Sequence, residues 1–145
     1  MTTKTKPVFK KFQRFDAQKA AKGVPHTIID PNENDYGTWT TSLYDPYNKF
    51  IKVENDRYER ENANNPLAKG KNSGIFAFVQ ICVQGWEGVV DADDKPIPFS
   101  KELAFEYLSD EDNGWFATEL IDRSKDVRYY RAVTPAATQE ADAGN

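Results

Sequence analysis

The sequence predicts an α+β fold, mostly helical, with about four helices and one β-hairpin packed on them. Two observations support this prediction. Two β-rich runs flank a turn cluster between residues 24 and 44, which is the pattern of a hairpin. Apolar residues then recur at helical spacing in four later segments. With 145 residues, of which 39% are hydrophobic, the chain has the size of one domain with a modest core.

The chain is expected to divide into an arm, a domain and a tail. Residues 1–14 form a basic arm without helical or strand spacing, so a flexible terminus is favoured, and docking of the arm on an acidic partner is the alternative. Residues 15–132 form a single α+β domain. Residues 133–145 are small and polar, which predicts a disordered tail. The basic residues of the arm are Lys4, Lys6, Lys10, Lys11 and Arg14.

The predicted hairpin begins with a β-branched run, from Val24 to Ile29. The segment from Asp30 to Asp35 is rich in Pro, Asn and Asp, which favour turns. In the return strand, Trp39, Thr41 and Leu43 share one face at a period of two. That face is expected to lie on the core.

Helices follow the hairpin. Asp45 and Pro46 are expected to start the first of them, which ends near Asn62. Residues 74–84 are expected to form a buried central helix, although their aromatic and β-branched residues leave a strand open. Residues 85–96 are expected to be a turn or an irregular crossing.

Two more helices complete the domain. Ser100 is expected to cap the first, which breaks at residues 110–114. Asn113 is expected to cap the last helix, over residues 114–131. Between the central helix and Ser100, the acidic turn at residues 91–95 is expected to bring Trp86 and Phe99 together.

The composition excludes several functions. There are 19 Lys and Arg against 23 Asp and Glu, so the net charge of −4 does not predict a nucleic-acid partner. No run approaches the ~18 apolar residues of a membrane-spanning helix. The sequence has one cysteine, Cys82, and one histidine, His26, which excludes an internal disulfide framework and Cys-rich or His-rich metal sites. The unpaired thiol fits a reducing, cytoplasmic compartment.

Catalysis and cofactors are not expected either. Asp91, Asp93 and Glu102 fall at positions of an EF-hand count, but Lys95 and Pro96 stand where a ligand and a glycine belong. The sequence has no Gly-rich phosphate loop and no nucleophile elbow. We therefore expect no metal, no cofactor and no enzymatic activity.

Aromatic residues are the unusual feature of the chain, at 13% of residues, and many lie beside turns. Partly exposed aromatic residues are typical anchors of protein interfaces. On a last helix extending to residue 131, Tyr129 would lie on the outer side, flanked by two arginines. The candidate partner-binding residues are Tyr129, Tyr130, Arg128, Arg131, Trp115 and Trp86.

A family resemblance adds to this interpretation. The segment from Gly85 to Ser100 resembles tail assembly chaperones of long-tailed bacteriophages, with a tryptophan and an aliphatic pair, then an acidic turn, then Pro-Phe-Ser opening a helix. The order of the later helices is similar, and the likeness covers roughly residues 12 to 131. Asp94 departs from the pattern, since a turn glycine is more usual there.

The resemblance implies a function in virion assembly. Such proteins bind the tape measure protein in the host cytoplasm, help to recruit tail tube subunits and are absent from the finished virion, and some are also made in a longer, frameshifted form. The expected partners are therefore the tape measure and tail tube proteins, with a homo-oligomer as an open option. The alternative is a structural virion protein of the head–tail joining or minor tail type.

Overall fold

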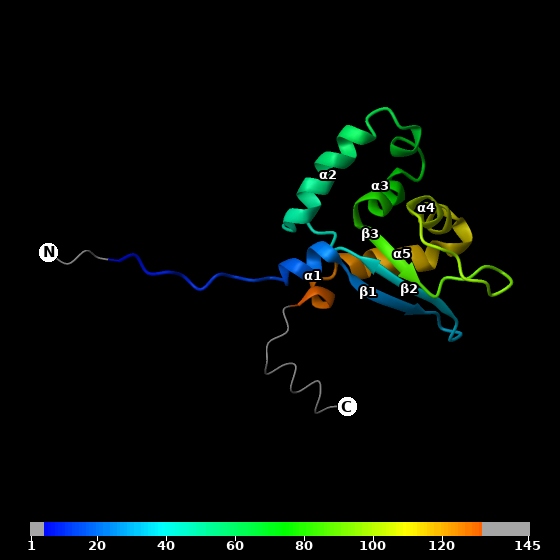
Figure 1. Ribbon diagram of the computed structural model, residues 1–145, viewed down its shortest axis with the longest axis horizontal. Helices are drawn as coiled ribbons and strands as arrows, with labels where there is room; N and C mark the ends of the chain where they lie inside the picture. The colour runs from blue at the N-terminus through cyan, green and yellow to red at the C-terminus, as the bar shows by residue number, and fades with distance from the viewer. Residues whose placement is uncertain (1–4, 132–145) are drawn as a thin grey trace, which may run out of the picture.

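The computed structural model describes residues 5–131 and confirms the α+β fold. In this part of the chain, five α-helices pack with a three-stranded sheet (Figure 1). The strands are β1 (Val24–Ile29), β2 (Asp35–Thr41) and β3 (Val83–Glu87). The α-helices are α1 (Ala17–Lys22), α2 (Lys49–Glu61), α3 (Ser73–Cys82), α4 (Lys101–Ser109) and α5 (Gly114–Lys125). Short 3-10 helices are η1 (Pro66–Ala68), η2 (Glu111–Asn113) and η3 (Val127–Tyr130).

The sheet contains the predicted hairpin and one strand more. Its antiparallel order is β1-β2-β3, with Trp39 of β2 between His26 of β1 and Trp86 of β3. The prediction of a turn or an irregular crossing over residues 85–96 is therefore wrong for residues 85–87, which belong to β3. The buried helix α3 is confirmed, but it ends at Cys82, and Val83 adopts an extended conformation that begins β3.

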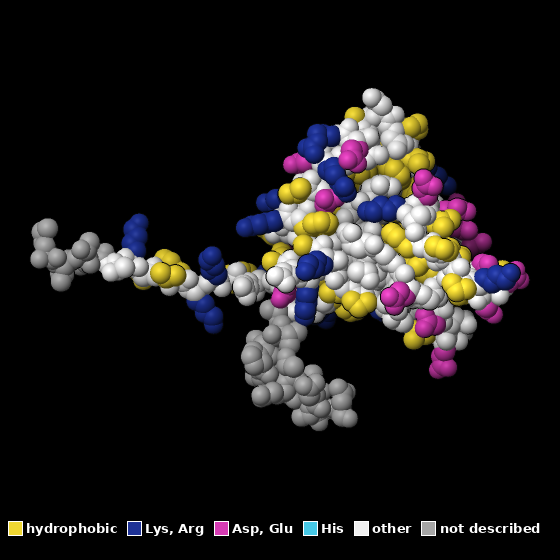
Figure 2. Space-filling model, in the orientation of Figure 1, with side chains coloured by type: hydrophobic (Ala, Val, Ile, Leu, Met, Phe, Trp, Pro, Cys, Tyr) yellow, Lys and Arg dark blue, Asp and Glu magenta, His cyan; other side chains and the backbone are white. Residues whose placement is uncertain are grey.

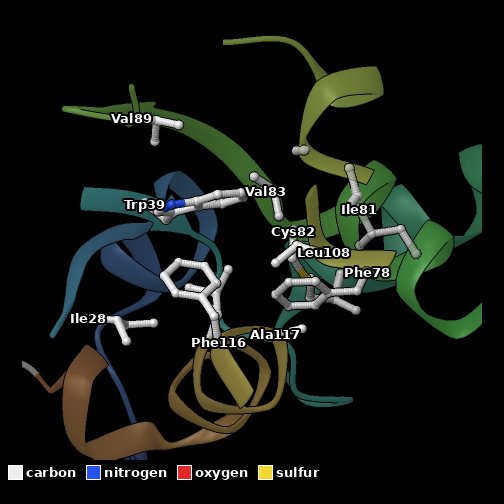
Figure 3. Packing of buried hydrophobic residues seen from close by; sticks show 14 residues of the cluster. Ile28, Trp39, Phe78, Ile81, Cys82, Val83, Val89, Leu108, Phe116 and Ala117 are labelled. Atoms are coloured by element: carbon white, nitrogen blue, oxygen red, sulfur yellow. The ribbon is translucent and has the colours of Figure 1, made fainter. Parts of the chain in front are cut away.

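The two faces of the sheet differ in polarity, as the hairpin pattern predicted. Trp39, Thr41 and Leu43 are fully buried. On the opposite face, the Oγ1 atoms of Thr27 and Thr38 lie 2.7 Å apart at the surface. Figure 3 shows Trp39 facing Phe116 of α5 in the middle of the core, and the two ring centroids are 5.3 Å apart.

The start of α2 differs from the prediction. Its N-cap is Asn48, whose Oδ1 accepts a hydrogen bond from the Phe50 amide, and not Asp45. Asp45 lies buried one turn earlier, where its carboxylate accepts from the Tyr47 amide and pairs with Arg14. Asn48 Nδ2 also donates to the carbonyls of Ala20 and Leu43 and so ties α1 to the chain after β2.

The last predicted helix is shorter than expected. It ends at Lys125 and not at residue 131, because the extended Asp126 turns the chain and caps η3 through the Arg128 amide. The short helix α1 was not predicted. Asp16 caps it, and Gly23 ends it at a φ of 96°.

The described part of the arm lies apart from the sheet. Residues 5–13 form no helix or strand and extend away from the body (Figure 1). The tail predicted at residues 133–145 and the first four residues of the arm lie outside the described residues.

Candidate binding site

The single histidine belongs to a buried polar network and not to an exposed site. His26 Nε2 lies 3.1 Å from the Tyr130 hydroxyl, and the histidine is only 2% exposed. The Tyr130 hydroxyl donates to the carbonyl of Thr41 at 2.8 Å. A phenol has only one proton, so His26 Nε2 must donate the hydrogen bond between the histidine and the Tyr130 hydroxyl. Nδ1 of the neutral imidazole then carries no proton.

The protonation state of His26 follows from this geometry. Its Nδ1 atom is buried and has no hydrogen-bond partner among the described residues. Burial, together with the nearby positive charge of Arg123, lowers the pKa of His26 from 6.5 to about 4. The imidazole is therefore neutral at pH 7 and serves to hold η3 against β1 and β2.

Cys82 is equally enclosed. It is 0% exposed, and burial raises the pKa of its thiol far above the usual range. A thiol that is neither exposed nor ionised is a poor nucleophile. The two most reactive side chains of the sequence thus belong to the packing of the fold.

The acidic turn at residues 91–95 is held by hydrogen bonds between the Asp91 carboxylate and backbone amides of the turn. Asp91 Oδ1 accepts hydrogen bonds from the amides of Asp93 and Lys95, at 2.8 and 3.0 Å. Within residues 5–131, no group of three or more His, Cys, Asp or Glu side chains is placed to hold a metal ion.

The two adjacent tyrosines point in different directions. Tyr130 is fully buried, which removes it from the candidate partner-binding residues. Tyr129 is 45% exposed, with its ring edge-on to His26 at 5.2 Å and the Arg123 guanidinium 5.8 Å from its centroid. Arg128 and Arg131 are exposed as well, and Arg128 pairs with Asp126.

Trp86 and Trp115 lie at another place on the molecule. Trp86, in β3, is partly buried, and its Nε1 donates to the carbonyl of Ile97 at 2.7 Å. It meets the Phe99 ring edge-on at 5.1 Å, which confirms the expected contact. Trp115, at the start of α5, is 50% exposed.

Two neighbouring hollows connect the tryptophans, and we call them the tryptophan face. The hollow beside Trp115 has a volume of about 290 Å³, and the one beside Trp86 about 210 Å³. Tyr107 and Asn113 line both, and Asn113 Nδ2 donates to the Tyr107 carbonyl at 3.0 Å. The other lining residues are Asp30, Pro31, Tyr36, Asp112 and Phe116 in the first and Val89, Ile97, Leu103, Glu106 and Asp110 in the second.

The tryptophan face is apolar and negatively charged. Its lining residues include four carboxylates and no Lys or Arg. The Tyr36 hydroxyl donates to Asp30 at 2.6 Å, and this bond, with the amides of Asn34 and Asn32, lowers the pKa of Asp30 to about 2. The Asp30 charge is therefore kept at any pH above about 3.

Larger hollows lie near the root of the arm. One of about 600 Å³ is formed between the arm, α1 and the start of α2, and one of about 500 Å³ lies between α2 and Lys125. Basic side chains outnumber acidic ones in both: Arg14 and Lys49 line the first, and Lys52 and Lys125 line the second together with Asp45. Opposite ends of the protein thus offer hollows of opposite charge.

The six predicted partner-binding residues therefore do not form one surface. The structure brings Trp86 and Trp115 to the tryptophan face and leaves Tyr129, Arg128 and Arg131 beyond the other end of α5. Sequence reasoning missed Tyr107 and Asn113, which join the two hollows. Tyr107 lies on α4, and nothing in the sequence indicated that its ring also borders these hollows.

The comparisons with known proteins place the chain in a family. The fold is that of a small α+β protein, and its candidate site is a surface with two hollows. The class of protein that the family match indicates is that of prophage proteins. The model of the YdaY prophage protein family matches residues 42–143, more than two thirds of the chain. The protein therefore belongs to the YdaY prophage protein family. No curated protein and no solved structure matches the chain.

The family match includes most of the candidate site. It covers α2 to α5 and β3, and with them every residue of the tryptophan face except Asp30, Pro31 and Tyr36. In the described part of the chain, no helix is long and apolar enough to cross a membrane.

Proposed function

We propose that the protein is a tail assembly chaperone, which binds the tape measure protein of its phage in the host cytoplasm and helps to recruit tail tube subunits. The prophage family supports a role in phage biology. The resemblance of residues 85–100 to such chaperones supports the narrower role. We propose a binding protein and not an enzyme, because His26 and Cys82 are both committed to the core.

The observation that carries the proposal is the half-exposed Trp115 on a rigid support. The side chain follows the cap of α5, and its neighbour Phe116 is 3% exposed and packs on Trp39 and Tyr107. An exposed tryptophan beside a hollow is a common anchor of protein interfaces, because it buries a large apolar area with little loss of side-chain freedom. We assign the client-binding surface to the tryptophan face.

The charges of this face define the client segment that it would take. A helix with apolar residues at i, i+3 and i+4 could place them in the two hollows. Lys or Arg beside those residues would meet Asp30, Glu106 and Asp112 at the rim. The client would therefore be a basic amphipathic segment, as a tape measure protein exposes before assembly if it is helical.

Tyr129 stays a second candidate anchor. Its exposure is close to that of Trp115, but part of its ring already contacts His26 and Arg123, and it lines none of the four hollows described above. The tryptophan face has both the anchor and a place for the client side chains, and we favour it for that reason.

Co-expression with the tape measure protein of the same prophage tests the proposal. The protein should keep the tape measure protein soluble and co-purify with it. Mass spectrometry of purified particles separates this function from the alternative, a structural virion protein. Stoichiometric presence of the protein in the particles would reject the chaperone and favour the structural role.

A further inference from the structure

The protein is strongly polarised in charge (Figure 2). Five of its 19 Lys and Arg lie in residues 1–14 with no acidic residue, so residues 15–145 hold 14 basic against 23 acidic residues. Lys and Arg follow the arm, whereas Asp and Glu gather at the opposite end of the body, near the turns that follow β1 and β3 (Figures 1 and 2). The tryptophan face, with its four carboxylates, belongs to this acidic end.

The arm carries apolar side chains that are largely exposed, although Phe12 borders the hollow of about 600 Å³ at the root of the arm. Val8, Phe9 and Phe12 are 95%, 83% and 90% exposed. They alternate with Lys6, Lys10 and Lys11 along the extended segment. Large apolar side chains on a basic extended segment are stabilised when they enter an apolar hollow with an acidic rim.

The tryptophan face offers this environment. Its hollows are lined by aromatic and aliphatic side chains, and their only charged lining residues are acidic. We propose that the arm of one copy of the protein binds the tryptophan face of a second copy. Phe9 and Phe12 would enter the hollows, and Lys10 and Lys11 would pair with Glu106 and Asp112 at the rim.

The geometry favours a second copy over the arm's own body. The ion pair of Arg14 with Asp45 holds the root of the arm beyond the end of β2, while Tyr36, at the start of β2, lies in the tryptophan face. A strand of this length spans about 20 Å. Phe12 is two residues from Arg14 and reaches only about 7 Å from it, so it cannot reach the face of its own chain.

The association joins different surfaces of the two copies. Such a contact either closes as a reciprocal pair or continues from copy to copy. Both forms place the arm on the surface that we assign to the client, so a client would have to displace the arm. This last consequence rests on the proposed function, but the association itself concerns the protein alone.

Sedimentation velocity of the full-length protein, without any client, tests the inference. At about 0.1 M salt the average mass should rise with protein concentration, and at about 1 M salt the association should weaken, because the Debye length falls from about 10 Å to about 3 Å. Reversing the charge of the arm with Lys10→Glu and Lys11→Glu should weaken association at least about tenfold, since like charges then meet across the interface. Both residues are exposed and lie outside every helix and strand, so we expect the variant to keep the fold.

A charge exchange makes the test specific. Glu106→Lys with Asp112→Lys should also prevent self-association, and mixing this variant with the arm variant should restore a complex. Glu59→Lys with Glu61→Lys, an equal change of charge on the exposed side of α2, is the matched control and should keep the self-association.

Two results would overturn the inference. One is a monomer at every concentration at low salt, which is also the result that docking on the same chain would give. The other is self-association that the arm variant does not weaken. Because no client is present in this experiment, either result leaves the proposed function untouched. If the protein self-associates as described but does not bind the tape measure protein, only the proposed function is rejected.

Discussion

At the scale of the residue, His26 shows how one polar side chain connects distant parts of the chain. Its Nε2–H reaches the hydroxyl of Tyr130, which also approaches Oγ1 of Thr41 at 3.1 Å. Thr41 Oγ1 in turn lies 2.6 Å from Oγ of Ser124, and Ser124 donates to Leu120. The network thus links β1, β2, α5 and η3, and each hydroxyl proton has an acceptor.

Stability should depend on pH because of His26. The folded-state pKa, about 4, lies below the unfolded value of 6.5, so the unfolded chain binds the proton more readily. The free energy of unfolding should therefore fall as the pH drops from about 6.5 to about 4, by at most about 3 kcal/mol. Urea melts across this range check it.

A substitution isolates this contribution. In His26→Gln, most of the pH dependence between pH 6.5 and 4 should vanish. Asp30 and Asp126, whose pKa values are lowered to about 2 from 3.8, lose their contributions only below about pH 4, so their window is separate. An unchanged slope in the histidine variant would show that folding does not lower the pKa of His26.

At the scale of the element, features that depend on neighbouring residues in the sequence could be predicted. Ser100 and its Leu103 bond confirm the predicted cap of α4, and the alternation around Trp39 identified the buried face of the hairpin. The boundary between α3 and β3 could not be predicted, because the apolar run from Ile75 to Val83 continues through it. The pairing of Trp39 with Trp86 determines that boundary, and it joins residues far apart in sequence.

The candidate site was predictable only in part, for the same physical reason. Two tryptophans beside turns could be recognised as anchors from their type and position. Whether they share a surface depends on tertiary packing. At Gly37, for example, β2 approaches the chain after β3 so closely that a Cβ would lie 2.8 Å from Cγ2 of Val89. The burial of Tyr130 depends on Asp126, which ends the helical geometry assumed for Tyr129 and Tyr130.

Lys101 should stabilise the end of α3 from another element. Its Nζ donates to the carbonyls of Val79 and Gln80, at 3.3 and 2.6 Å, in the last turn of that helix. Burial lowers the pKa of the ammonium, which shows the cost of bringing it there. Lys101→Met keeps the aliphatic chain and removes the donors, and we expect a loss of about 1–2 kcal/mol in urea melts. Lys95→Met, in an exposed turn, is the control, and an equal loss in both variants would contradict this role.

Phe99 should stabilise the entry to α4 through Trp86. The ring is partly buried, so Phe99→Ala should cost about 1–3 kcal/mol, less than the 3–5 kcal/mol of a fully buried phenylalanine. Thermal or urea melts measure the effect. Phe12→Ala, at a 90% exposed position of the arm, should leave stability unchanged at protein concentrations too low for self-association. A loss below about 0.5 kcal/mol for Phe99→Ala would show that its contact with Trp86 contributes little.

At the scale of the whole molecule, the protein combines a packed body with two ends of opposite charge. The acidic end presents the tryptophan face on α4, α5 and β3, and the basic end carries the extended arm (Figures 1 and 2). A body fixed by buried networks and aromatic packing keeps an interface in place, and a mobile partner can then bind without reshaping it. This arrangement suits a protein that holds a client during assembly.

The affinity for the tape measure protein, measured in matched variants, tests the central claim most directly. Trp115→Ala should weaken binding by about 1–2 kcal/mol, as expected for an interface anchor, while the melting temperature stays close to that of the parent. Tyr129→Ala removes an aromatic ring of similar exposure and should leave the affinity unchanged. Weaker binding in Tyr129→Ala alone would move the client to the other end of α5, and no binding of the tape measure protein by the unmodified chain would contradict the account.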